Sequence, residues 1–180
     1  ANGETWSDLQ VVISYDSLQA GNPAPVVDRF DPAYPLGRIL LFYNTGNNHE
    51  GEVRKGKGLR ECWMISSVDG GHTWSVPNNI TGQVHYPNYV SDKHNYQSDK
   101  DWRSYANTPG HALQFIRGKY KGRIFIPANH SAGLPKADFT DYSAHGYYTD
   151  DHGKTFKLSE TLPLAGSNES IAVELPDNGL

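Results

Sequence analysis

Two octets in the sequence place a carboxylate between hydroxyl-bearing residues. The first runs from Ser67 to Trp74 and the second from Thr149 to Phe156, and both follow the pattern Ser/Thr-x-Asp-x-Gly-x-Thr-aromatic. One interpretation makes Asp69 and Asp151 catalytic carboxylates. The other is a turn, because a hydroxyl and a carboxylate two residues apart can accept hydrogen bonds from the backbone N–H groups of their own turn. We favour the turn.

The remaining positions of the octets also suit a turn between two strands. Glycine permits positive φ, and the aromatic residue begins the return strand with a large apolar face. A second repeated element, Gly-Arg-Ile-Leu/Phe, precedes each octet, and this repetition favours a structural role for its arginines, Arg38 and Arg123. The expected structural set is Ser67, Asp69, Gly71, Thr73 and Trp74 in the first octet and Thr149, Asp151, Gly153, Thr155 and Phe156 in the second.

Composition favours an all-β protein over a helical one. The 180 residues include 18 Gly, 11 Pro, one Met and 12% aromatic residues, and short alternating runs are bounded by turn formers. A net charge of −4 is not typical of a nucleic-acid-binding protein. No apolar run reaches the roughly 18 residues of a membrane helix, and the first residues lack the basic and apolar regions that would predict a signal peptide. The single cysteine, Cys62, and the scattered histidines predict no metal site.

The two octets resemble Asp boxes, the repeats of sialidase-type β-propellers. Further segments resemble bacterial exo-α-sialidases in the same order along the chain: Gly21–Asp28, Pro109–Gln114, Pro127–His130 and Asn168–Leu175. The resemblance covers essentially the whole sequence. It implies an all-β fold, a partial six-bladed β-propeller of four-stranded antiparallel blades, of which we expect about half the ring here.

The resemblance also divides the chain into blades. Residues 22–80 and 110–160 are expected to form two blades, with residues 1–13 as the last strand of an earlier blade and 168–180 as the first strand of a later one. Expected strands are 24–28, 38–43, 62–67 and 73–76, then 111–116, 123–127, 146–149 and 155–158. Because strand direction alternates, the octets lie at one end of the blades and the long connections at the other. Long loops on a rigid scaffold commonly carry function, so we expect the site opposite the octets.

Three polar residues stand immediately before the innermost strands: Asn22, His111 and Glu169. We expect them to converge on one pocket near the propeller axis, although Asn22 and His111 could instead cap strand ends. The resemblance makes Glu169 the catalytic glutamate that activates a tyrosine nucleophile. The arginine triad, the acid/base aspartate and the nucleophilic tyrosine of the family match no position here and are expected outside this sequence.

A long connection, residues 78–108, holds aromatic residues among polar ones and suits sugar binding. The resemblance places 102–114 in a segment that lines the pocket. A loop packed by its own aromatic side chains is the alternative. The expected substrate-binding residues are therefore Asn22, Trp102, Tyr105, His111 and Gln114.

These expectations combine into one functional hypothesis with two rivals. The resemblance implies an exo-α-sialidase-like glycosidase that releases terminal sialic acid from glycans with retention, needs no cofactor, and is secreted, periplasmic or on the cell surface. We expect the 180 residues alone to be inactive. One rival is a non-catalytic Asp-box propeller that binds a glycan or a protein, and the other is a propeller glycosidase or lyase for another acidic sugar. Linkage preference and oligomeric state stay open.

Overall fold

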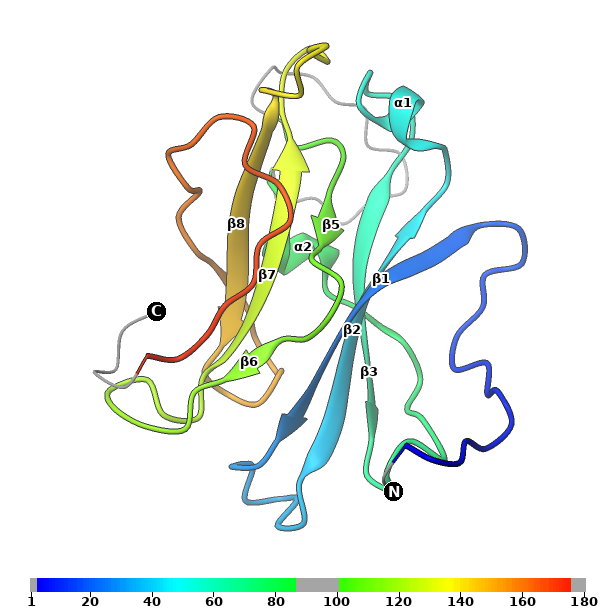
Figure 1. The fold of residues 1–180 in the computed structure, drawn as a ribbon, viewed down its shortest axis with the longest axis vertical. Helices are drawn as coiled ribbons and strands as arrows, with labels where there is room; N and C mark the ends of the chain where they lie inside the picture. The colour runs from blue at the N-terminus through cyan, green and yellow to red at the C-terminus, as the bar shows by residue number, and fades with distance from the viewer. Residues whose placement is uncertain (1–2, 87–100, 176–180) are drawn as a thin grey trace.

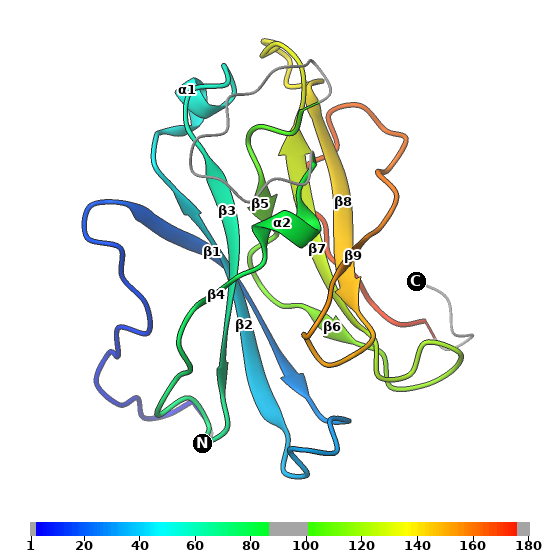
Figure 2. The same cartoon turned by 180° about the vertical axis from the view of Figure 1, so that it is seen from behind.

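The computed structural model describes residues 3–86 and 101–175, which fold into two antiparallel sheets packed side by side (Figures 1 and 2). The first sheet has the order β1 (Gln19–Asp28), β2 (Arg38–Gly46), β3 (Arg60–Ser67) and β4 (Asn78–Asn79). Neighbours in the sheet are also neighbours in the chain, so this sheet is a simple meander.

The second sheet repeats that arrangement with a divided inner strand. Its order is β5 (Ala106–Asn107), β7 (Ile124–Ser131), β8 (Tyr142–Thr149) and β9 (Lys157–Leu158), and β6 (Leu113–Gln114) also pairs with β7. Two one-turn helices interrupt the connections. Helix α1 (Glu50–Val53) lies between β2 and β3, and α2 (Thr81–Val84) contacts β3 and β9.

The apolar core lies between the two sheets. Leu40 and Phe42 of β2 and Ile124 and Ile126 of β7 are fully buried, as alternation along each strand predicts. The Phe42 ring meets Tyr147 edge-on at 6.1 Å, which joins the two sheets through aromatic contact. The all-β expectation is confirmed by these sheets, whereas the number of blades in the complete protein stays a prediction.

The observed strands differ from the expected ones mainly at the edges. The strand expected at 155–158 shortens to the two-residue β9, whereas residues 73–76 form no strand and the fourth strand of the first sheet, β4, lies at 78–79 instead. The inner strand expected at 111–116 shortens to β6, and the unexpected β5 also pairs with β7. Pro109, which lacks an amide donor, and Gly110, with φ 137°, separate these two parts of the inner strand. Residues 4–13 and 170–175 form no strand, since no described segment pairs with them.

The strands run roughly parallel to the long axis of the molecule, so their connections gather at two ends (Figure 1). We call the end that carries the octets and the β1–β2 and β6–β7 turns the turn end. The opposite end, with α1 and the β2–β3 and β7–β8 connections, is the loop end. Among the described residues, no helix is long and apolar enough to span a membrane.

Candidate functional site

A polar pocket opens at the loop end, where connections from both sheets meet. Its volume is about 300 Å³, and three residues expected in the site line it: Asn22, Tyr105 and Glu169. We call it the loop-end pocket. Glu50, Arg60 and Tyr142 also line this pocket.

Glu50 is the most densely bonded carboxylate of the loop-end pocket. It accepts hydrogen bonds from the Ser104 and Tyr142 hydroxyls, and Arg60 Nη2 lies 3.2 Å from its Oε2. Half of the Glu50 side chain remains exposed, so it can also meet a ligand. The charge of Arg60 is compensated by Glu50. No local pattern marks Glu50 in the sequence, because its partners come from β3, β8 and the segment before β5.

Tyr142 is a hydrogen-bond donor here. Burial, together with the hydrogen bond to Glu50, raises the pKa of Tyr142 to about 12. A nucleophilic phenol needs the opposite shift, because only the phenolate attacks readily. The structure therefore gives no reason to assign Tyr142 as the nucleophile.

Asn22 connects the two sheets at the edge of the loop-end pocket. Its backbone has φ 54°, a left-handed conformation that asparagine tolerates better than most residues. Its Nδ2 donates to the Asn107 carbonyl oxygen at 3.0 Å. Asn107 in turn donates its N–H to Asn44 Oδ1 and accepts the Tyr147 hydroxyl at 2.9 Å. Asn22 is thus both a lining residue and part of a buried network between sheets.

Glu169 lies on an extended segment that crosses the second sheet. The next residue, Ser170, donates its N–H to Thr108 Oγ1 at 3.2 Å, and Ser167 Oγ accepts the Ala144 N–H at 2.9 Å. These contacts hold the backbone on both sides of Glu169. The Glu169 side chain itself is exposed, and among the described residues no group bonds its carboxylate. A free carboxylate at a pocket can act as a base.

Trp102 and Tyr105 belong to a buried cluster beneath the loop-end pocket. The Trp102 ring stacks on His130 at 3.7 Å, and Tyr105 stacks on His85 at 5.2 Å. His130 Nδ1 lies 3.1 Å from His145 Nδ1. We call these five residues the histidine cluster. Trp102 does not line the pocket, since its ring face is covered by His130, whereas Tyr105 lies at the pocket floor.

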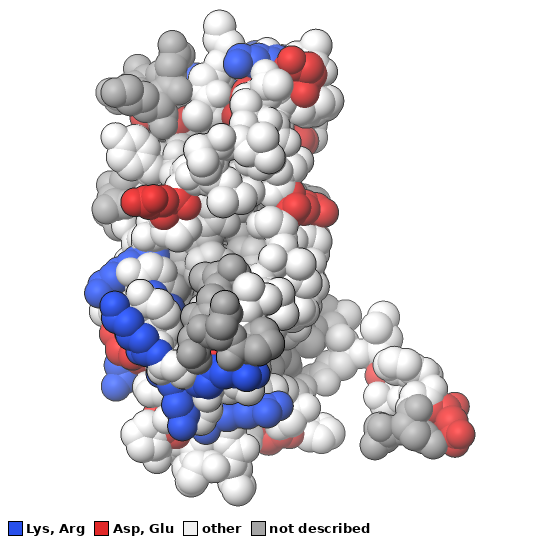
Figure 3. Space-filling model, turned by 60° about the vertical axis from the view of Figure 1, so that its left-hand side comes forward, with Lys and Arg blue, Asp and Glu red and all other residues white. Residues whose placement is uncertain are grey.

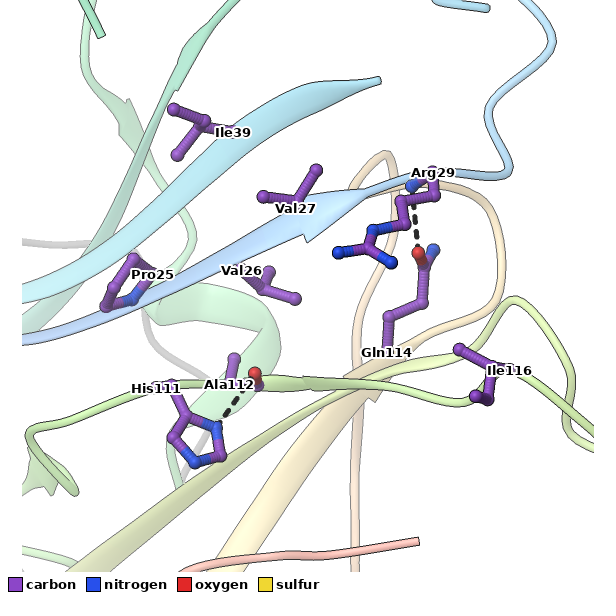
Figure 4. Close-up of a pocket in the computed structure, with 9 residues that line it drawn as sticks. All are labelled: Pro25, Val26, Val27, Arg29, Ile39, His111, Ala112, Gln114 and Ile116. Atoms are coloured by element: carbon purple, nitrogen blue, oxygen red, sulfur yellow. Dashed lines mark hydrogen bonds between the residues drawn. The ribbon is translucent and has the colours of Figure 1, made fainter. Parts of the chain in front are cut away.

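His111 and Gln114 lie apart from Glu169, contrary to the expected convergence. They line a different pocket of about 510 Å³ between β1 and β6, whose walls are mostly apolar (Figure 4). The ring of His111 turns toward the Ala112 carbonyl oxygen, 3.3 Å away. Gln114 accepts the Arg29 N–H at 2.8 Å and donates to Asp28 Oδ1 at 2.7 Å. Its amide bonds the end of β1, the residue after it and the Gly122 carbonyl oxygen, so it connects the sheets.

The two octets form the same hydrogen-bond network at the turn end. Ser67 Oγ accepts the Gly71 N–H at 2.8 Å, and Asp69 accepts the N–H of Thr73 at 2.9 Å. The second octet repeats these bonds from Gly153 to Thr149 and from Thr155 to Asp151, at 2.8 and 2.9 Å.

The same bonds govern ionisation of the octet aspartates. Hydrogen bonds from the side chain and backbone of Thr73, and from Ser67, lower the pKa of Asp69. Burial opposes ionisation of Asp151, but the bonds from Thr155 outweigh it and also lower its pKa. Both carboxylates are therefore saturated acceptors within their own turns. Trp74 donates its indole N–H to the Gly71 carbonyl oxygen, and Phe156 is buried against Phe42.

A group of possible metal ligands joins the two sheets at the turn end. Atoms of Asp28, Asp31 and His152 lie within 4.8 Å of one another. The guanidinium of Arg38 already meets Asp31 at 3.1 Å, and His152 Nδ1 lies 3.0 Å from Asp28. Gln114 supplies a further donor to Asp28. Arg38 offsets part of the negative charge, and His152 and Gln114 contact Asp28, so we assign the cluster to the contact between sheets.

An antiparallel sheet of four strands and a similar one of five, each with an octet turn after the third strand in its order, define a propeller-type repeat protein. The chain belongs to the BNR repeat-like domain family, whose model matches residues 1–178. The resemblance noted in the sequence is thereby confirmed at the level of the family.

Curated relatives of the chain are named sialidases. The mouse protein named Sialidase-4 is 25% identical over 91% of this chain, and the sialidase of Micromonospora viridifaciens is 26% identical over 97%. The chain spans 32% and 25% of the lengths of these two relatives.

Solved structures show the same fold. A leech intramolecular trans-sialidase, bound to 2,7-anhydro-Neu5Ac, superposes with a TM-score of 0.68 at 14% identity, covering 98% of this chain and 40% of that one. A Hadza microbial sialidase, Hz136, superposes with a TM-score of 0.62 at 19% identity, covering 88% and 29%.

Proposed function

We propose that the chain is part of an exo-α-sialidase-like glycosidase that releases terminal sialic acid from glycans with retention of configuration. The observation that carries the proposal is the loop-end pocket, where Glu169 and Asn22 line one polar cavity. The substrate class, sialylated glycans, is inferred from relatives that are named sialidases.

In this proposal Glu169 is the base that activates a tyrosine nucleophile. Sialic acid bears a carboxylate on its anomeric carbon, so a carboxylate nucleophile would meet like-charge repulsion. A neutral phenol avoids that repulsion but needs a base, because its ordinary pKa is near 10. The free, exposed carboxylate of Glu169 is suited to that task. The tyrosine, the arginines that bind the substrate carboxylate and the acid/base aspartate match no residue of this chain.

The remaining lining groups are suited to orienting a sugar. The exposed half of Glu50 can accept hydrogen bonds from sugar hydroxyls, while Arg60, Ser104 and Tyr142 keep its carboxylate in place. Asn22 holds the edge of the pocket through Asn107. Polar groups fixed by a second layer of contacts favour specificity over adaptability.

The test is the substitution Glu169→Gln in the full-length protein, with Glu160→Gln as the matched control. Glu160 is an exposed glutamate on the same C-terminal segment. Glu169→Gln should lower kcat for an aryl sialoside by about 10²–10⁴-fold, while the control keeps the wild-type rate. Unchanged turnover by Glu169→Gln would exclude the assigned base. A wild-type protein that binds the sialoside without turning it over would favour a glycan-binding propeller.

A further inference from the structure

The β6–β7 turn carries a concentration of positive charge at the turn end. Arg117, Lys119, Lys121 and Arg123 fall within seven residues that include no acid, although the whole chain has a net charge of −4. Figure 3 shows Lys and Arg side chains gathered in the lower half of the face that it presents. Such a local excess in an acidic protein indicates an interaction surface.

A cavity lies within this charged region. Its volume is about 570 Å³, and it is bounded by the β1–β2, β6–β7 and β8–β9 turns, so both sheets contribute. This volume lies in the range of about 300–1,000 Å³ that is usual for small-ligand sites. We call it the turn-end pocket. Its lining residues include Phe30, Lys119, Tyr120, Lys121, Arg123 and Asp150.

The cations of the turn-end pocket are not equivalent. Arg123 forms two hydrogen bonds with Asp150, at 2.7 and 2.9 Å, so its charge is compensated. Lys119 and Lys121 are exposed, and among the described residues neither forms an ion pair. Two uncompensated ammonium groups therefore line one cavity, and an anion placed between them would be attracted by both.

Aromatic rings hold these lysines at the pocket. Lys121 Nζ lies 5.1 Å from the centre of the Phe30 ring, and Lys119 Nζ lies 5.2 Å from that of Tyr120. Cation–π contacts of this length stabilise exposed pairs modestly. They restrict the lysine side chains before a ligand arrives, which reduces the entropy lost on binding.

We propose that the turn-end pocket binds an anionic sugar unit of an acidic polysaccharide, with its carboxylate or sulfate group between Lys119 and Lys121. One cavity with two free cations fits a single anionic group, whereas a nucleic acid requires a longer track of phosphate contacts. The Phe30 and Tyr120 rings line the same cavity and add apolar surface for a sugar beside the cations, while Lys121, Lys119 and Arg123 cover part of their faces.

The turn-end pocket is distinct from the site proposed for catalysis. Strand β7 separates the two ends of the second sheet, and its eight residues span about 27 Å. A polysaccharide held at the turn end therefore leaves the loop-end pocket open. Binding there would raise the local concentration of the protein on an acidic glycan surface. The inference does not depend on the activity assigned to Glu169.

The experiment compares three forms of the full-length protein: wild type, Lys119→Ala/Lys121→Ala, and the control Lys154→Ala/Lys157→Ala. The control removes the same charge from two exposed lysines that do not line the cavity, Lys154 in the second octet and Lys157 in β9. Calorimetric titration uses polygalacturonate, dextran sulfate and neutral dextran, none of which carries sialic acid, and duplex DNA. Polygalacturonate tests the carboxylate as the bound anion and dextran sulfate tests the sulfate.

We expect the wild type and the control to bind at least one acidic polymer and to bind no neutral dextran. Lys119→Ala/Lys121→Ala should weaken that binding by about tenfold or more, the equivalent of about 1.4 kcal/mol. All three forms should hydrolyse a small sialoside equally. An equal loss in the control would show nonspecific charge attraction and overturn the site. Binding of neutral dextran, or of duplex DNA with affinity equal to that of the acidic polymers, would also overturn it.

Discussion

The octet aspartates differ in their surroundings although their hydrogen bonds match. Gly153 of the second octet is buried, and a Cβ added there would lie 3.2 Å from Met64 Sδ. Phe156 of the same octet packs against Phe42 and Tyr147. The first octet is open to solvent around Asp69. The second turn is therefore tied to the core, and breaking it should disturb more of the molecule.

We predict that Asp151→Ala destabilises the full-length protein by about 1–3 kcal/mol, because the Thr155 and Thr149 donors lose a charged acceptor. Asp69→Ala should cost less. Since hydrogen bonding lowers the pKa of Asp151, this contribution is present at neutral pH and is lost as pH falls below about 4, through the folded-state pKa. Urea unfolding at pH 7 measures both variants.

The same variants separate the turn from a catalytic role. Turnover per folded molecule should stay at the wild-type value in Asp151→Ala, since its carboxylate is saturated at the end opposite Glu169. A fall in kcat at full occupancy of the native state would contradict the turn assignment. A larger loss of stability in Asp69→Ala than in Asp151→Ala would contradict the closer packing of the second octet against the core.

At this scale the sequence predicts local chemistry well and long-range contacts poorly. The octet network could be predicted because its donors and acceptors lie within eight residues. Glu50 could not, because Ser104, Tyr142 and Arg60 approach it only in the folded chain. Trp102 is expected to contact a sugar, but it stacks on His130 of β7. The sequence pattern does not determine where β7 lies relative to Trp102.

The elements that join the two sheets are short strands rather than long ones. β6 has two residues, yet the backbone N–H groups of Gly110 and Ala112, just before it, donate to the carbonyl oxygens of Pro23 and Pro25, each at 3.0 Å. Gln114 adds one side-chain bond to Asp28 at the end of β1 and one to Arg29, which follows it. The order of strands followed from the alternating pattern and the turn residues. The division of the inner strand did not, since it depends on the backbone conformation of Gly110.

We predict that Gln114→Ala destabilises the full-length protein by about 1–3 kcal/mol, because the buried Asp28 carboxylate loses a donor. Gln114→Glu should be worse at pH 7, since it places a second carboxylate beside Asp28, and the difference between the two variants should shrink toward pH 4 as carboxylates protonate. Thermal unfolding across this pH range measures the effect. A higher KM with unchanged stability would instead support the substrate-binding role expected for Gln114.

At the scale of the whole molecule, the proposed catalytic pocket, the octet turns and the buried histidine cluster occupy different places. The loop end holds the polar pocket, the turn end holds the octets and the charged cavity, and the histidine cluster lies buried between the sheets beneath the loop-end pocket. Burial lowers the pKa of His130 to about 3, and burial also lowers that of His145, so both imidazoles are neutral at physiological pH. A proton on either imidazole would create a charge that water cannot solvate, because the Trp102 and Tyr105 rings pack against His145.

The cluster therefore predicts that the native state weakens in acid. Between pH 6.5 and 3 the unfolded chain binds a proton at His130 that the native state refuses, so the free energy of unfolding decreases as pH falls. At pH 5 the loss is about 2 kcal/mol for His130. Urea unfolding of the full-length protein at pH 7.5 and 5.0 should show this decrease in the wild type and in His72→Gln, whose imidazole is exposed. His130→Gln should be less stable at pH 7.5 but lose less between the two pH values. Equal losses in all three forms would place the acid sensitivity elsewhere in the molecule.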